Sequence, residues 1–270
     1  MTNDVPAPAP PTSDPPHGPL ARHFRAAHAA VTFLTRIPWP FPATDPPTPD
    51  DLARSTLYFP LVGVLVGAVG AALNWLGTLI WPAPVAIVIA LAGMILLTGA
   101  LHEDGLADAA DGLGGGWSRD QTLAIMKDSR IGSYGAVAIV LSIAIKVATL
   151  STLAPIDVAR ALIAGHTLGR WTSLPLLRRS PYVRESRGAG APYAGAVTVP
   201  RLTVATLLTV AVVAALLGWR ALPVLAAVIV VTVLAGWYFR RRLGGITGDC
   251  LGATNQCAEL ATYLVLAAQF

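Results

Sequence analysis

The chain has 270 residues, of which 54% are hydrophobic and only 13% are charged, and its mean hydropathy is +0.60. A soluble domain usually carries about 25% charged residues, and a disordered chain combines low hydrophobicity with high charge, so both classes are excluded. The formal net charge of +4 is better explained by loop charges that orient a membrane protein than by a nucleic-acid partner, which we do not expect.

The N-terminal residues differ from the rest of the chain. Residues 1–19 are rich in proline and poor in large apolar side chains, which predicts a disordered tail. Residues 20–36 mix arginines with large apolar residues, the pattern of an amphipathic helix that lies on the membrane surface. The prolines that follow end this helix. We expect residues 20–270 to form a single membrane-embedded domain.

The apolar segments are long and continuous, which favours an all-α, polytopic helical integral membrane protein over a membrane β-barrel with alternating segments. A bilayer core requires about 20 apolar residues per helix. Suitable stretches lie at 57–81, 85–101, 136–153, 158–177, 202–218 and 221–239, with a weaker and more polar one at 251–270. The sequence therefore predicts about six to seven transmembrane helices surrounded by lipid.

The distribution of basic residues predicts the orientation. If the stretches cross the membrane alternately, most of the 19 lysine and arginine residues fall in loops on one side. The positive-inside rule identifies that side as cytoplasmic. We therefore expect a multi-pass protein of the cell inner membrane whose polar loops, and any site that they form, face the cytoplasm.

Four carboxylates directly follow the second apolar stretch, in the sequence HEDGLADAADG at 102–112. If the helix continues there, Asp104, Asp108 and Asp111 lie on one face, where their mutual repulsion calls for a cation. Oxygen ligands favour Mg²⁺ or Mn²⁺ over zinc. The alternative is a solvated acidic helix end. The expected metal ligands are Glu103, Asp104, Asp108 and Asp111.

Basic residues lie near these acids in the sequence. Lys127 and Arg130 stand beside glycines and hydroxyl side chains, a composition that suits phosphate binding, although they could also be orientation charges. Arg170 follows His166 by one helical turn within an apolar stretch. It is expected either to bind phosphate or to form a structural pair with a buried acid. Arg184 belongs to the long connection at 178–200, which could form a substrate lid.

The last polar cluster precedes the seventh stretch. Asp249 follows glycines and Thr247 at an expected helix start, where it either caps the helix or joins the metal cluster. Asn255 and Glu259 extend the same polar face toward the membrane interior. Lys146, near the far end of the third stretch, is expected to extend its ammonium group outward to the interface.

Five segments, taken in order, resemble the cobalamin synthase family, the adenosylcobinamide-GDP ribazoletransferases. They are FLTRIP at 33–38, YFPLVG at 58–63, the acidic segment at 102–112, MKDSRIG at 126–132 and GGITGDCLGA at 244–253. The resemblance implies a Mg²⁺-dependent membrane enzyme of cobalamin (vitamin B12) biosynthesis. Such an enzyme joins adenosylcobinamide-GDP to α-ribazole or α-ribazole 5′-phosphate and releases GMP.

This resemblance suggests roles for the polar residues. The carboxylates at 103–111 would hold metal against the pyrophosphate, and His102 or a carboxylate would take the hydroxyl proton. The expected catalytic residues are His102, Asp104, Asp108 and Asp111, and the expected substrate or phosphate ligands are Lys127, Arg130, Arg170, Arg184 and Asp249. The sequence does not determine whether the protein forms a homo-oligomer.

Two other functions remain as alternatives at this point. CDP-alcohol phosphotransferases share an Asp-Gly-x-x-Ala-Arg core, but Asp108 and Ala109 stand where that pattern has alanine and arginine. A cation-coupled transporter would also use carboxylates. Transporter sites tend to lie near the bilayer midplane, whereas these acids gather at one interface.

Overall fold

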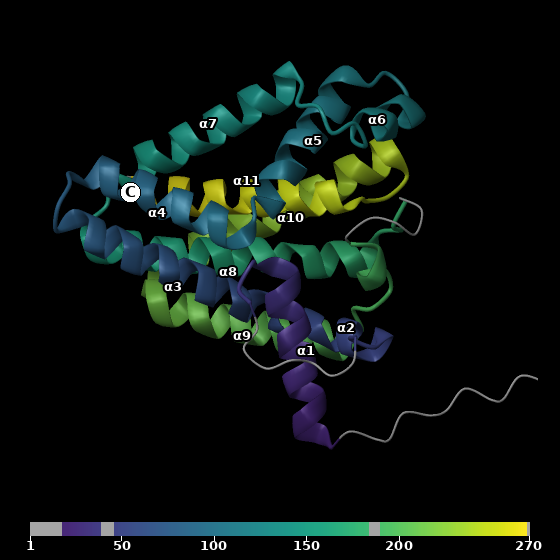
Figure 1. Cartoon of the computed structure of the whole chain (residues 1–270), viewed down its shortest axis with the longest axis horizontal. Helices are drawn as coiled ribbons and strands as arrows, with labels where there is room; N and C mark the ends of the chain where they lie inside the picture. Colours follow the sequence, from purple (N-terminus) through teal and green to yellow (C-terminus); the bar gives the residue numbers. More distant parts are fainter. Residues whose placement is uncertain (1–17, 39–45, 184–189, 269–270) are drawn as a thin grey trace, which may run out of the picture.

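A computed structural model describes residues 18–38, 46–183 and 190–268, and this part of the chain is helical (Figure 1). Most of the predicted disordered tail lies outside the described residues. The long helices are α1 (Pro19–Leu34), α3 (Phe59–Thr78), α4 (Ala83–Thr98), α5 (Leu101–Gly115), α7 (Ser133–Leu150), α8 (Pro155–Arg179), α9 (Val199–Leu217), α10 (Ala221–Leu243) and α11 (Gly248–Ala267). Shorter elements are α2 (Pro49–Ser55), α6 (Arg119–Ile125), η1 (Thr56–Tyr58), η2 (Ala191–Tyr193) and η3 (Gly218–Arg220).

The helices form an elongated bundle in which polar segments that are far apart in the sequence share one end. Helices α5 and α6 lie at that end, together with the start of α11 and the ends of α8 and α10 (Figure 1). Helix α3 packs along α8, and α11 packs against α5, α8 and α10. The fold therefore brings the acidic segment and the glycine-rich segment at 244–253 to the same end of the bundle.

Small residues allow the close packing of α3 on α8. A Cβ atom added to Gly67 would lie 2.5 Å from Ile163 Cα, and one added to Gly63 would lie 2.3 Å from the His166 carbonyl oxygen. Interfaces between membrane helices are enriched in small residues because these let the backbones approach closely. Helix α8 is thereby held in the interior, with most of its polar residues buried.

The second apolar helix does not run on into the acidic segment as one continuous helix. Gly99 and Ala100 both adopt the left-handed conformation, with φ of 65° and 58°. Helix α4 ends there, and α5 leaves at an angle of 89°. The Arg36 amide donates to the Leu97 carbonyl oxygen at 2.7 Å, which satisfies one carbonyl at the end of α4. The carboxylates still share one helix, α5.

The described helices support a polytopic membrane protein. Three helical stretches are long and apolar enough to cross a bilayer, and the bent pair α4–α5 makes a fourth if it is counted as one span. The three are Pro49–Thr78, Ser133–Leu150 and Val199–Leu243. Helices α8 and α11 are more polar and largely buried among the others. The predicted total of six to seven spans stays a prediction.

Substitution of Gly67 by valine should destabilise the bundle, because the new side chain would meet the α8 backbone. We expect a cost of about 1–3 kcal/mol, the usual range for overpacking. Thermal unfolding of the purified protein in detergent measures the effect. Ala72→Val, on the exposed face of the same helix, is the matched control. Equal stability of the two variants would contradict the proposed contact.

Candidate functional site

A pocket of about 230 Å³ lies where α5, α11, α8 and α1 meet, and we call it the acidic pocket. Asp104 and Asp108 line it from α5, and Asp249 lines it from α11. His102, at the start of α5, also reaches it. Four of the residues expected to form a site therefore share one cavity, although they come from segments about 140 residues apart in the sequence.

The pocket depends on the close contact of α5 with α11. A Cβ atom added to Gly105 would lie 3.1 Å from Gly252 Cα and 3.2 Å from Asp249 Cα. Thr247 caps α11, because its side-chain oxygen accepts a hydrogen bond from the Cys250 amide. The structure thus gives the capping role to Thr247 and places Asp249 at the pocket.

The acidic pocket is lined by oxygen donors of the kind that magnesium takes in proteins. Among the described residues, no group of three or more His, Cys, Asp or Glu side chains could hold a metal ion unaided. Magnesium is usually bound by one or two carboxylates together with water and substrate phosphates. Asp104, Asp108 and Asp249 offer oxygen donors around a cavity with room for such a phosphate.

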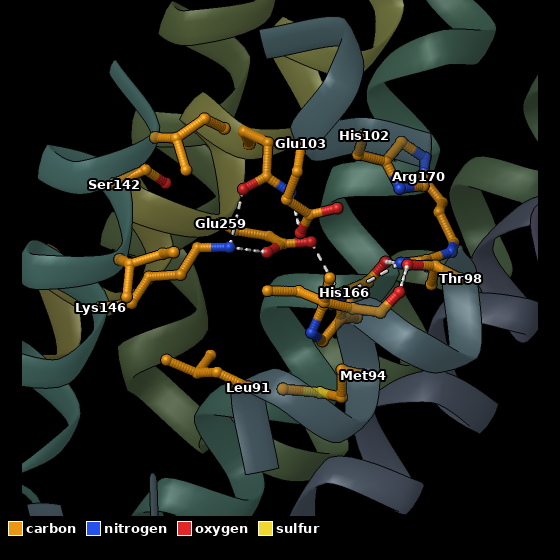
Figure 2. Close-up of a pocket in the computed structure, with 14 residues that line it drawn as sticks. Leu91, Met94, Thr98, His102, Glu103, Ser142, Lys146, His166, Arg170 and Glu259 are labelled. Atoms are coloured by element: carbon orange, nitrogen blue, oxygen red, sulfur yellow. Dashed lines mark hydrogen bonds and ion pairs between the residues drawn. The ribbon is translucent and has the colours of Figure 1, made fainter. Parts of the chain in front are cut away.

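A second group of polar residues lies inside the bundle, and we call it the buried polar cluster (Figure 2). Lys146 Nζ of α7 lies 2.6 Å from Glu259 Oε2 and 2.8 Å from Gln256 Oε1, both on α11. The His166 Nδ1 atom of α8 lies 2.8 Å from Glu259 Oε1. This contact is an ion pair when the imidazole is protonated, and Arg170 Nη1 lies 3.2 Å from the same Nδ1 atom.

The buried polar cluster extends to α5 and to Arg170. The Gln256 side-chain amide donates to Glu103 Oε1 at 3.2 Å. Arg170 Nη1 donates to the His166 carbonyl oxygen at 3.2 Å, and Figure 2 shows both residues converging on the same cavity of about 20 Å³. That volume is enough for one water molecule but not for a phosphate. His102 lines both this cavity and the acidic pocket, so it joins the two sites.

Lys146 is buried, so the expectation that it extends outward to the interface is wrong. Its side chain is 5% exposed and forms an ion pair with Glu259. The signal in the sequence was the polar residue Ser142 one turn earlier on the same face of α7, which also lines the small cavity. A lysine that merely snorkelled would not need a polar neighbour deeper in the apolar stretch.

Asp111 lies away from the acidic pocket and binds the start of α7. Its carboxylate accepts hydrogen bonds from the amides of Gly132 at 2.7 Å and Gly135 at 2.9 Å. A carboxylate is favourable at a helix N-terminus because it satisfies free amides and interacts with the helix dipole. The structure therefore gives Asp111 a connecting role between α5 and α7.

The predicted cationic residues do not converge on one point. Lys127 is exposed near the end of α6, and Arg130 is exposed in the connection to α7. Arg130 binds Asp128 through an ion pair of 2.7 Å, and these hydrogen bonds lower the pKa of Asp128 to about 2. Arg170 belongs to the buried polar cluster. Arg184 lies outside the described residues.

The wall of the acidic pocket that α1, α3 and η2 form is aromatic, which the sequence did not predict. Phe33, Phe59 and Tyr193 all line the pocket, and their ring centroids lie 4.6–5.9 Å apart. Burial raises the pKa of the Tyr193 phenol to about 12, so this wall is uncharged at neutral pH. Phe33 and Phe59 belong to the segments that carry the family resemblance, which was the available signal.

Comparison with known proteins identifies the family. The family model described as cobalamin-5-phosphate synthase matches residues 26–267. Proteins named adenosylcobinamide-GDP ribazoletransferase are similar throughout: one from Shewanella frigidimarina is 40% identical, covering 92% of this chain and 95% of its own. One from Ralstonia pickettii is 44% identical, covering 89% and 94%. No solved structure matches the chain.

Substitution of Glu259 by glutamine should strongly destabilise the protein, because it leaves Lys146 buried without a counter-charge. Breaking a buried pair in this way costs about 3–5 kcal/mol. Unfolding in detergent should show this loss, and the double variant Lys146→Met with Glu259→Gln should recover much of it.

Asp157→Asn is the matched control, since it removes the exposed ion pair with Arg160. Exposed pairs are typically worth at most about 1 kcal/mol. If Glu259→Gln lowered the free energy of unfolding no more than Asp157→Asn does, the ion pair of Lys146 with Glu259 would not stabilise the bundle.

Proposed function

The chain belongs to the cobalamin-5-phosphate synthase family, and we propose that its acidic pocket joins adenosylcobinamide-GDP to α-ribazole or α-ribazole 5′-phosphate. This is the activity of an adenosylcobinamide-GDP ribazoletransferase, a transferase of cobalamin biosynthesis. The relatives bear this name rather than that of a CDP-alcohol enzyme or a transporter. The observation that carries the proposal is the meeting of three carboxylates from two distant segments in one pocket.

The reaction exchanges one phosphate ester bond for another. The ribazole hydroxyl oxygen forms a bond to the phosphorus on the cobinamide side of the pyrophosphate. The bond between this phosphorus and the bridging oxygen breaks, and GMP leaves with the electron pair. The hydroxyl proton passes to a base. Because the reacting groups carry several negative charges, the protein acts mainly by positioning them and by balancing charge.

Asp104, Asp108 and Asp249 would hold Mg²⁺, or Mn²⁺ in its place, against the pyrophosphate oxygens. The ion would supply charge neutralisation for the attacked phosphorus and the leaving GMP. His102 lines the same pocket and, with the carboxylates, is a candidate for the base that takes the hydroxyl proton. Glu103 and Asp111 make contacts elsewhere, and we assign them to fixing α5 on its neighbours.

The cationic residues divide into two groups in this proposal. Arg170 is buried beside a cavity that is too small for phosphate. We therefore assign it to holding the neighbouring side chains in position rather than to binding substrate. Lys127 and Arg130 lie at the polar end of the bundle, where a bound phosphate could compete with Asp128 for Arg130. We propose that this end, with the acidic pocket, faces the cytoplasm at the inner membrane, because the positive-inside rule favours that side for loops rich in basic residues.

Asp104→Asn should abolish turnover while the protein stays folded, because Asp104 is exposed to the pocket and its replacement removes one oxygen ligand. The measurement is GMP release from adenosylcobinamide-GDP and α-ribazole by protein purified in detergent. GMP should appear together with an equal amount of the cobalamin product, only with Mg²⁺ or Mn²⁺, and not with EDTA.

Asp120→Asn is the control for this experiment, since Asp120 is an exposed carboxylate on the neighbouring helix α6. It should retain wild-type turnover. Wild-type rates in Asp104→Asn, or metal-independent GMP release, would overturn the assignment of the acidic pocket. Release of CMP from a CDP-lipid in place of this reaction would overturn the activity itself.

A further inference from the structure

The acidic pocket has two chemically different walls. Asp104, Asp108 and Asp249 line one wall, whereas three aromatic rings line the part formed by α1, α3 and η2. Carboxylates suit a metal ion that in turn binds the phosphates of the proposed reaction, but this leaves the aromatic wall without a role. The aromatic side chains must therefore be explained either as packing alone or as a second binding surface.

The three rings form a compact stack. Phe33 and Phe59 stack with their centroids 5.9 Å apart and an interplanar angle of 28°. Tyr193 meets Phe33 at 4.6 Å and Phe59 at 5.3 Å. Phe59 and Tyr193 are buried, with 3% and 2% of their surface exposed, whereas Phe33 is only half-buried. Phe33 therefore has free ring surface at the pocket, and the other two rings hold it in place.

The wall is also poor in hydrogen-bonding groups. The pocket is also lined by Leu34, Leu101 and Leu177, and by Ser173 one turn before Leu177 on α8. Among the three rings, Tyr193 alone carries a polar side-chain atom, and its hydroxyl is hydrogen-bonded to Ser55. Such a surface favours a flat apolar ring. It disfavours a base with many donors and acceptors on its edge, because burial would leave those groups unpaired.

We infer that the aromatic wall formed by Phe33, Phe59 and Tyr193 binds the planar base of α-ribazole and so selects the acceptor substrate. This inference rests on the proposed function. The base of α-ribazole is an alkylated benzimidazole, which has a large π-face and few polar edge groups. The guanine of adenosylcobinamide-GDP is planar too, but its edge carries several donors and acceptors that this wall does not match.

This placement is consistent with the reaction. The acceptor base binds on the aromatic wall, and the ribose that it carries extends toward the carboxylates that line the same pocket. The hydroxyl nucleophile is thereby directed to the metal and pyrophosphate side of the same pocket. The aromatic wall acts as a binding and specificity surface, and it takes no part in bond making.

The test compares the KM for α-ribazole with the KM for adenosylcobinamide-GDP in variants of Phe33. Phe33→Ala should raise the KM for α-ribazole about 5- to 100-fold, the range for loss of one stacked base, and Phe33→Leu should raise it about 2- to 10-fold. Phe33→Tyr keeps the ring and should stay within about 2-fold of the wild type. The KM for adenosylcobinamide-GDP should not change in any of them.

Phe24→Leu is the matched control, because Phe24 lies on the same helix, is 47% exposed and does not line the pocket. It should leave both KM values unchanged. Three results would overturn the inference: an unchanged KM for α-ribazole in Phe33→Ala, a rise confined to adenosylcobinamide-GDP, or equal rises for both substrates. The second result would assign the wall to guanine, and the third would indicate a general change in pocket shape.

Equilibrium binding separates this inference from the proposed function. Calorimetric titration of the full chain with α-ribazole alone needs no turnover, and Phe33→Ala should weaken binding by the same factor as it raises KM. Binding that depends on Phe33 in a protein that forms no cobalamin would overturn the proposed function and support the wall as a base-binding surface. Cobalamin formation by a protein whose affinity for α-ribazole does not depend on Phe33 would support the proposed function and overturn the aromatic wall as a base-binding surface.

Discussion

Where α5 passes α11, no side chain separates the two backbones, because Gly105 faces Gly252. A Cβ atom on either residue would lie 3.1 Å from the Cα of the other, tighter than nine in ten contacts of this kind. The meeting of the three carboxylates depends on this approach, since it places Asp249 beside the helix that carries Asp104 and Asp108. A larger residue at either glycine would separate the carboxylates that the proposed chemistry requires together.

The buried polar cluster supports the same two helices from the interior. Glu259 binds Lys146 of α7 and His166 of α8, and Gln256, one turn earlier on α11, binds Glu103 of α5. Charged groups within an apolar bundle are costly unless they are paired, so these contacts permit few alternative packings. On the other flank, Asp111 fixes α5 to the start of α7. The carboxylates of the pocket thus project from a helix held on both sides.

Much of the fold follows from the sequence, because long apolar runs and their flanking charges are local signals. They indicated the helices and the gathering of the polar segments at one end. The break at Gly99 and Ala100 was missed, since a left-handed alanine has no strong signature and depends on Arg36 of a distant segment. The pairing of Lys146 with Glu259 was missed for a similar reason, because it joins residues 113 positions apart. The acidic motif predicted Asp104 and Asp108 as site residues. The aromatic wall could not be predicted in this way, because it forms only when α1, α3 and η2 come together in the fold.

The most direct test of the account is the electron paramagnetic resonance spectrum of Mn²⁺ bound to the full-length protein with adenosylcobinamide-GDP. The account predicts a bound ion with ³¹P coupling to the pyrophosphate, and loss of that signal in the variant Asp104→Asn with Asp249→Asn. Unchanged ³¹P coupling in this variant would show that the metal lies elsewhere. A spectrum without ³¹P coupling in the wild type would contradict a metal shared between the acidic pocket and the substrate.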